Sequence, residues 1–180
     1  LVVEDGYKNL SKRKIAKRVG CSVGTIYLYF KNKDAIFHAL IDEGFEQLYN
    51  AYQSIIMSEF DPVQRLANTC RVFIEFGLKH PVYYEIMFMH HPNLTERYPK
   101  EMYRRARRFL TVTAELLADC SEAELLEIED PMVDATVLWS AMHGITSLII
   151  SQRVDAKFDQ AKLINKAIHQ AINSFRASEQ

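Results

Sequence analysis

Apolar side chains recur along this chain three or four residues apart, the spacing of an α-helix, and no stretch shows the strict alternation typical of a strand. Six glycines and five prolines are few for 180 residues, so long uninterrupted helices are expected. The pattern predicts an all-α fold. Beyond the first thirty residues, the expected helices run from Lys33 into the fifties, from Pro62 to about His80, over 82–89, from about Thr95 to Ala118, from about Pro131 to Ser151, and from Asp159 to Phe175.

Two shorter helices joined by a tight turn are predicted between residues 11 and 30. Ser11 is a suitable N-cap for the first helix, and Gly20 can adopt the left-handed conformation that ends it. Ser22 can cap a second helix that begins at Val23. This is the pattern of a helix-turn-helix, in which the second helix enters the major groove of DNA.

The charge distribution supports a polyanionic partner for this first part of the chain. Residues 1–33 contain eight lysines and arginines against two acidic residues, although the whole chain has a net charge of −1. A basic head on an acidic body fits DNA, because neutralising phosphates releases counterions. A solvated lysine-rich helix face is the alternative explanation for the charge alone.

The helix-turn-helix belongs to a longer pattern of N-terminal residues. This pattern consists of Gly6, Tyr7, Ile15, Ala16, Gly20, Ser22, Gly24, Thr25, Tyr27, Tyr29, Phe30 and Lys33. In order and spacing it resembles the DNA-binding domain of the TetR family of bacterial transcription regulators. The resemblance implies a homodimeric all-α regulator with a DNA-binding domain over residues 1–45 and a helical ligand-sensing and dimerisation domain over 46–180. It also implies that the first helix is incomplete, so we expect the chain to extend upstream of Leu1.

The same resemblance assigns expected roles at the DNA. Thr25 and Tyr29 are expected to reach base edges, and Val23 to offer an apolar contact. The other positions are expected to hold phosphates, Gly24 through its backbone. The complete set of expected DNA contacts is Lys12, Ser22, Val23, Gly24, Thr25, Tyr27, Tyr29 and Lys33.

The segment 135–150 contains no charged residue, which suggests burial on all sides rather than a membrane span, for which it is too short. Packing against a second copy of the chain would bury it, and packing within one subunit is the alternative. Ser140, Gly144, Ser147 and Ser151 form a small-residue seam for close helix approach. The last helix adds Ile164, Ile168, Ala171 and Phe175 to the expected dimer interface.

Large apolar side chains crowd the helices of the predicted body. They suit a pocket for a small hydrophobic or aromatic effector, although filling the core is the simpler role for any one of them. The candidates are Phe73, Phe76, Met87, Phe88, Trp139, Met142 and His143. Trp139, His143 and Gly144, with residues 81–88, also resemble a C-terminal subgroup of the family that is named for a Trp–His–Gly signature. The arginines at 104, 105, 107 and 108 are expected to form a solvated surface.

Other chemistry finds little support in the sequence. Cys21, Cys70 and Cys120 share no short spacing and suggest reduced thiols in a cytoplasm. His90 and His91 with Met87 and Met89 lack the partners of a metal site, and no catalytic motif or cofactor signature is present. We therefore expect a cytoplasmic repressor without cofactor or metal, released from a palindromic DNA operator by its effector. A corepressor-dependent regulator or activator is the alternative, and an all-helical enzyme is a remote one.

Overall fold

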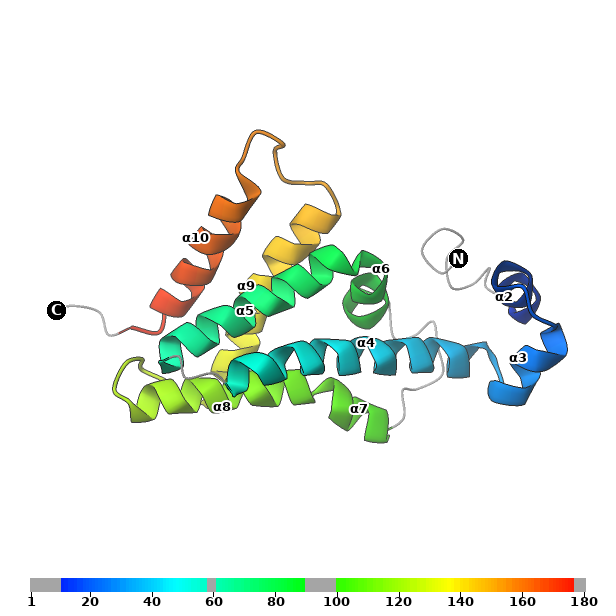
Figure 1. Ribbon diagram of the computed structural model, residues 1–180. Coiled ribbons are helices and arrows are strands. Elements are labelled where there is room, and N and C mark those ends of the chain that lie inside the picture. Colours follow the sequence, from blue (N-terminus) through cyan, green and yellow to red (C-terminus); the bar gives the residue numbers. More distant parts are fainter. Residues whose placement is uncertain (1–10, 58–60, 90–99, 177–180) are drawn as a thin grey trace.

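The computed structural model describes residues 11–57, 61–89 and 100–176. All regular elements within these ranges are helices, which confirms the predicted all-α class. A small head lies at one end of a long helix, and a layered helical body surrounds the other end (Figure 1). Two predictions lie outside the described residues: that the chain extends upstream of Leu1, and that His90 and His91 form no metal site.

The head contains α2 (Lys12–Val19) and α3 (Val23–Tyr29), as the capping signals predict. Ser11 accepts a hydrogen bond from the backbone of Lys14, and Gly20 ends α2 with a φ of 78° in the left-handed region. Both amides after α2, those of Gly20 and Cys21, donate to the carbonyl of Ala16. The turn between the helices is therefore set by local hydrogen bonds.

Helix α4 (Lys33–Ile56) links the head to the body without a break (Figure 1). The Asn32 side chain accepts from the amide of Ala35 at 2.8 Å and starts the helix. At its beginning, Ile36 packs with Ala16 and Ile26 in the small core of the head. Because α4 continues well past residue 45, the predicted boundary between the domains falls inside one rigid element.

The body contains seven further elements among the described residues. They are α5 (Pro62–Lys79), α6 (Pro81–Tyr84), the π-helical turn η2 (Glu85–Met89), α7 (Lys100–Ala106), α8 (Arg108–Glu122), α9 (Pro131–Ile150) and α10 (Gln160–Asn173). Asp61, Asp130 and Asp159 cap α5, α9 and α10 through their side chains. The starts predicted at Pro62, at about Pro131 and at Asp159 agree with these helices to within one residue.

Helix α5 lies at the centre of the body, where it contacts α4, α8, α9 and α10. Leu66 and Ile74 of α5, Leu48 of α4 and Leu117 of α8 are fully buried there. The packing is close enough that a Cβ added to Gly77 would lie 2.5 Å from Cγ2 of Thr146. Gly77 therefore allows α5 and α9 to approach each other closely.

The structure corrects two of the predicted helices. The helix expected from Thr95 to Ala118 is two helices, α7 and α8, which separate at Arg107. No proline or glycine lies at this break, so the local sequence contains no signal for it. The short helix expected over 82–89 is present, but its second half, η2, is wound as a π-helix.

Candidate functional site

The outer surface of α3 is unusually apolar for an exposed helix. Tyr27, Leu28 and Tyr29 are 61%, 84% and 78% exposed, while Ile26 is the one buried residue of the helix. Ser22 accepts from the amide of Thr25 at 3.0 Å, and the two hydroxyl groups lie 2.8 Å apart. The cap thus fixes the start of α3 and leaves its aromatic side chains facing outward.

Lys12 of α2 ties the two helices of the head together. Its ammonium donates at 2.7 Å to the carbonyl oxygens of both Phe30 and Lys31 and lies 3.6 Å from the ring centroid of Tyr27. These contacts fix the C-terminal end of α3 against α2. Lys12 therefore has a bracing role that the sequence did not indicate, and its phosphate contact stays a prediction.

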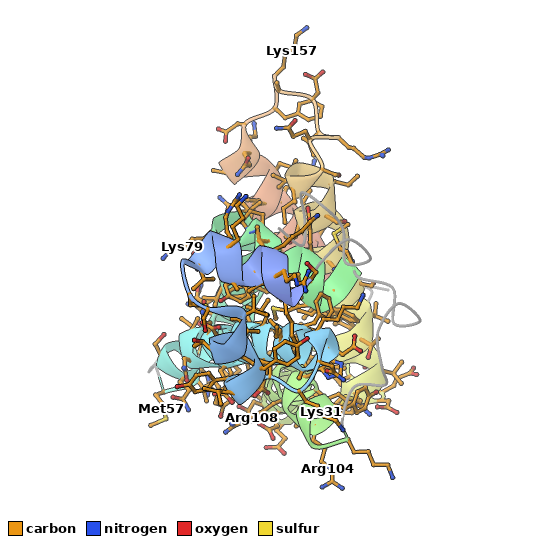
Figure 2. The ribbon with its side chains drawn as sticks, turned by 90° about the vertical axis from the view of Figure 1, so that its right-hand side faces the viewer. Lys31, Met57, Lys79, Arg104, Arg108 and Lys157 are labelled. Atoms are coloured by element: carbon orange, nitrogen blue, oxygen red, sulfur yellow. The ribbon has the colours of Figure 1, made fainter. Side chains whose placement is uncertain are left out.

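The start of α4 lies directly beyond α3. Lys33 is its first residue, and its first turn offers backbone amides together with the positive end of the helix dipole. Lys31 lies on the head, which faces the viewer in Figure 2. A phosphate beside α4 would therefore meet both a lysine and a helix N-terminus.

A cleft of about 390 Å³ opens in the body where α4, η2, α7, α8 and α9 meet. Its inner part is apolar and aromatic, because Phe45 and Phe109 are buried there. Its outer part carries the exposed side chains of Tyr103 and Arg107. The lining residues are Phe45, Met87, Phe88, Tyr103, Ala106, Arg107, Phe109, Leu110 and Trp139.

A second and much smaller cavity of about 20 Å³ lies behind this cleft. Phe109 and Trp139 line both spaces, and their ring centroids lie 5.7 Å apart in an edge-to-face arrangement. Phe88 contacts both rings at 5.8 and 6.0 Å. These three aromatic rings thus form the wall between the outer cleft and the inner cavity.

Tyr84 and His143 form a polar pair beside the aromatic wall. The Tyr84 hydroxyl and Nδ1 of His143 lie 2.6 Å apart, and the two rings stack with centroids 5.5 Å apart. Burial raises the pKa of Tyr84 above its usual range and lowers the pKa of His143. The Tyr84 hydroxyl therefore stays protonated and shares a hydrogen bond with a neutral imidazole.

Comparison with known proteins identifies both parts of the chain. Residues 1–40 match the N-terminal profile of the bacterial regulatory proteins of the tetR family. Residues 66–171 match the tetracyclin repressor-like C-terminal domain, and this match alone covers more than half of the chain. The chain belongs to the TetR family. It is a transcriptional regulator with a DNA-binding helix-turn-helix, and the prediction that it is not an enzyme is confirmed by the family.

Among curated TetR-family relatives, the fatty acid metabolism regulator protein of Bacillus subtilis (strain 168) is 37% identical over 67 residues, 37% of this chain and 34% of that protein. The nucleoid occlusion factor SlmA of Mannheimia succiniciproducens is 28% identical over 78 residues, 43% of this chain and 36% of that protein. The chain thus matches about a third of the length of these relatives.

Solved structures resemble the whole chain at low identity. The fatty acid degradation regulator FadR from Bacillus halodurans has a TM-score of 0.76 at 19% identity and covers 98% of this chain and 91% of its own. FadR from Bacillus subtilis in complex with stearoyl-CoA has a TM-score of 0.73 at 19% identity, with 95% and 91% covered. PfmR from Thermus thermophilus has a TM-score of 0.75 at 14% identity, with 96% and 92% covered. These likenesses establish the TetR fold.

Most of the residues predicted from the sequence for the effector site lie around the two spaces. Met87 and Phe88 line the outer cleft, Phe73 and Met142 line the inner cavity, and Trp139 lines both. His143 lines neither, although its ring lies against those of Phe88 and Trp139. Phe76 lines neither space, because it is buried beside His80 and lines a separate groove between α4 and α5. Its assignment to the effector site is therefore corrected.

The predicted dimer residues separate into two groups. On α9, Ser140 and Ser151 are exposed, and a Cβ added at Gly144 would meet nothing within 4 Å, so this face is open. On α10, Ile164 and Ile168 are only 7% and 3% exposed because they pack into the core of their own subunit, which corrects their assignment to the interface. Ser147 on α9 is partly buried, and Ala171 and Phe175 are partly buried against the core.

Several residues of the site escaped the sequence interpretation. Phe45 and Phe109 lie on helices far apart in sequence, and nothing local distinguishes them from ordinary core residues. Arg107 was expected on a general solvated surface with its neighbours, and Figure 2 does show Arg104 projecting away from the body. The break between α7 and α8 instead places Arg107 at the edge of the cleft. Only the density of arginines there could have suggested this role.

Helix α9 is long and apolar enough to cross a membrane by length and composition alone, the one such helix in the described ranges. It is also the helix with the open face, whose outward residues Val133, Val137 and Leu148 are about half exposed. Such a helix is weak evidence for a membrane span in a protein whose family binds DNA. A protein partner is the simpler cover for this face.

Proposed function

We propose that this TetR-family regulator is a homodimeric repressor that is released from a palindromic operator by a small amphiphilic effector. One observation carries the proposal: α4 is shared between the two ends of the molecule. Ile36 of α4 belongs to the core of the head, and Phe45, nine residues further along, lines the cleft. An effector in the cleft can therefore act on the head through one continuous helix.

The π-helical turn η2 supports a route from the cleft to α4. Ile86 packs on Phe37 of α4 in a small cluster of its own. A Cβ added to Gly44 would collide with Sδ of Met87, so the Met87 side chain of η2 lies directly on the backbone of α4 there. Because Met87 and Phe88 also line the cleft, an effector that displaces them would press directly on α4. A shift of α4 would favour a head spacing that no longer fits DNA.

The chemistry of the cleft favours an amphiphile with an anionic group. Its inner wall is apolar, and the structure gives Arg107 at its edge no carboxylate partner among the described residues. A guanidinium binds carboxylates and phosphates well, while an alkyl or aromatic body would fill the apolar part. The fatty acid regulators among the similar proteins, one of them in complex with stearoyl-CoA, support an acyl effector here as well.

The open face of α9 supports dimerisation. Val133, Val137, Gly144 and Leu148 follow one another along it without a charged residue. The Ser140 and Ser151 hydroxyls donate back to carbonyls of their own helix, at 2.7 Å to Val137 and 2.6 Å to Ser147. These serines therefore need no water and can be buried against the same face of a second copy.

At the DNA, we propose that α3 enters the major groove with Tyr29 and Thr25 at the base edges. Tyr29 is exposed on the outer face, and the Thr25 hydroxyl, which shares a hydrogen bond with that of Ser22, keeps a further lone pair for a base edge. Val23, partly buried against the head core, is left with an apolar contact such as a thymine methyl group. Ser22, Gly24, Tyr27 and Lys33 would hold phosphates around it, and the positive end of α4 would assist Lys33.

Selection of bound duplexes from a random DNA pool, with the mass of the protein in solution measured in parallel, tests the DNA-binding part. We expect a palindrome and a dimer, and we expect the Gly144→Arg variant to be monomeric. Failure to enrich any sequence would refute sequence-specific binding, and a Gly144→Arg dimer would refute the α9 interface.

The effector part is tested by titrating decanoate into the complex of the protein with the selected operator. We expect decanoate to weaken operator binding, and we expect the Arg107→Gln variant to need a higher concentration. Tighter operator binding with decanoate would instead make the protein corepressor-dependent. No response from an operator-bound dimer would exclude an acyl effector of this length.

A further inference from the structure

The inner cavity lies deep in the body and is built from four helices, α4, α5, α8 and α9. Its volume of about 20 Å³ is close to what a single water molecule, or one hydroxyl group of a ligand, requires. Its lining is mixed rather than purely apolar. The lining residues are Tyr52, Thr69, Cys70, Phe73, Phe109, Thr113, Leu138, Trp139 and Met142.

Two polar atoms of this lining are buried without a hydrogen-bond partner among the described residues. They are the hydroxyl Oγ1 of Thr69, a residue only 1% exposed, and the indole Nε1 of Trp139. A buried polar group that forms no hydrogen bond is costly, so native proteins rarely keep one without a reason. Two of them on the wall of one small cavity point to a group that binds there.

A neighbouring threonine shows that this is not a general property of the body. Thr113, in the same lining, donates its hydroxyl to the carbonyl of Phe109 at 3.0 Å. Thr146, buried on α9 outside the cavity, donates to the carbonyl of Met142 at 2.7 Å. Both form the backbone bond that a helical threonine usually forms, and Thr69 does not. The Thr69 hydroxyl is therefore available to a ligand.

The position of the cavity connects it with the effector cleft. Phe109 and Trp139 line both spaces, whereas Arg107, which is exposed, lines the cleft alone. An elongated ligand whose charged end lies at Arg107 would point its other end at this aromatic wall. Rotation of the Trp139 or Phe109 side chain would join the cleft to the cavity.

We infer that the inner cavity is the far end of the effector site and that it selects effectors carrying a hydroxyl group at the end remote from their anionic group. This inference rests on the effector site proposed above. The hydroxyl would accept a hydrogen bond from Trp139 Nε1 and exchange one with the Thr69 hydroxyl. Thr69 and Trp139 are then residues that determine specificity.

The electrostatics of the cavity support a neutral group rather than a second charge. Burial raises the pKa of the Cys70 thiol to about 12, and burial together with nearby Cys70 raises the pKa of Tyr52 well above its usual range. Both groups therefore stay uncharged, and no lysine, arginine or acidic residue lines the cavity in the part of the chain that the structure describes. A carboxylate would lose its hydration there without gaining a counter-ion.

The test compares two probes, 10-hydroxydecanoate and decanoate, which differ only in the terminal hydroxyl. Trp139 is the single tryptophan of the chain and lines both spaces, so its fluorescence reports binding of either probe in the cleft or the cavity, and the comparison of the two probes isolates the cavity. We expect 10-hydroxydecanoate to bind about fivefold more tightly, the effect of one net hydrogen bond. The Thr69→Val variant, which keeps the shape and removes the hydroxyl, should abolish this preference. Thr146→Val serves as the matched control and should keep it.

The possible outcomes separate this inference from the proposed function. Equal binding of the two probes would overturn the inference and leave an acyl effector in place. A preference for the hydroxylated probe that persists in Thr69→Val would also overturn it. If neither probe binds, both the inference and the acyl effector fail.

A measurement without ligand provides a second, independent check. Thr69→Val removes an unpaired buried hydroxyl, so we expect its melting temperature to be unchanged or about 2 °C higher. Thr146→Val removes a hydroxyl that forms a hydrogen bond, so its melting temperature should fall. An equal fall in both variants would show that Thr69 is already satisfied in the free protein and would overturn the inference.

Discussion

The head formed by α2 and α3 and the body formed by α5–α10 use large apolar side chains in opposite ways. In the described part of the head, only Ala16, Ile26 and Ile36 form the buried core, while Tyr27, Leu28 and Tyr29 face outward. In the body, tyrosines as large as Tyr52 and Tyr84 are completely buried. The head places its aromatic residues on a surface, and the body places them in an interior.

The difference also extends to the polar groups. The head satisfies them locally, through the Ser11 and Ser22 caps and the Lys12 brace, so that its surface shape is fixed in advance. The body leaves the hydroxyl of Thr69 and the indole nitrogen of Trp139 unsatisfied at its centre. A surface that reads DNA benefits from being preorganised, whereas a site that responds to a ligand benefits from an incomplete interior.

The largest effect should come from removing core volume in each part. Leu117→Ala in the body should lower the free energy of unfolding by about 3 kcal/mol, because Leu117 is fully buried in the main core. Ile26→Ala in the head should abolish operator binding. The urea midpoint of the main unfolding transition, which comes mostly from the helices of the body, should stay unchanged. Urea unfolding followed by circular dichroism, beside operator titrations, measures both. Equal loss of global stability in the two variants would mean that head and body unfold as one unit.

The link between the two parts is tested at Gly44. A methyl group there collides with the Met87 side chain, so Gly44→Ala should displace Met87, as we propose that the effector does. We expect operator affinity to fall about tenfold without ligand, equivalent to about 1.4 kcal/mol. The double variant Gly44→Ala with Met87→Ala should recover it, because the colliding atom is gone. Unchanged affinity in Gly44→Ala would argue against transmission through η2.

A smaller effect is expected at the phosphate contact of the head. Lys33→Ala should weaken binding to all duplexes alike and reduce the slope of log affinity against log salt by about 0.9, because one phosphate contact is lost. Tyr29→Ala provides the contrast, since it should change base preference and leave the slope as it is. Operator titrations over a series of salt concentrations distinguish the two. An unaltered slope in Lys33→Ala would remove Lys33 from the phosphate contacts.

The smallest effect concerns pH and lies entirely in the body. Burial lowers the pKa of His143 below that of the unfolded chain, so the unfolded state binds the extra proton first as pH falls. Stability should therefore be constant above about pH 6.5 and decrease below it. Melting temperatures at pH 7.5 and 5.5 should differ more in the wild type than in His143→Gln. The same difference in both proteins would assign the acid sensitivity to other groups.

Much of the fold follows from local signals in the sequence. The caps predicted at Ser11 and Ser22 are present, and the apolar periodicity along the chain was enough to predict most of the other helices within a residue or two. The break at Arg107 was not predictable, because no helix-breaking residue marks it and the packing of two helices on α4 from different directions decides it. Local chemistry thus determines where helices begin, and tertiary contacts determine where some of them end.

The site was only partly predictable for the same reason. The helix-turn-helix is a local pattern, so its candidate residues could be identified directly from their spacing. The cleft is assembled from five elements, and Phe45 and Phe109 join it only through contacts between distant segments. The hydrogen bond from Lys12 to the Phe30 carbonyl joins residues eighteen positions apart. The sequence around a lysine at the start of a helix does not indicate whether such a bond forms.

Because α4 is unbroken, a small rotation of the helix at the cleft would produce a larger displacement at the head. From Phe45 to Lys33 the helix rises about 18 Å, so a tilt of roughly 5° about the cleft moves the head by about 1.6 Å. In a dimer, two such heads would change their separation by about 3 Å, against the roughly 34 Å between successive major-groove sites on one face of DNA. In the proposed mechanism, α4 would act as a lever arm, so that a small tilt at the cleft would change the spacing of the two heads enough to disfavour DNA binding.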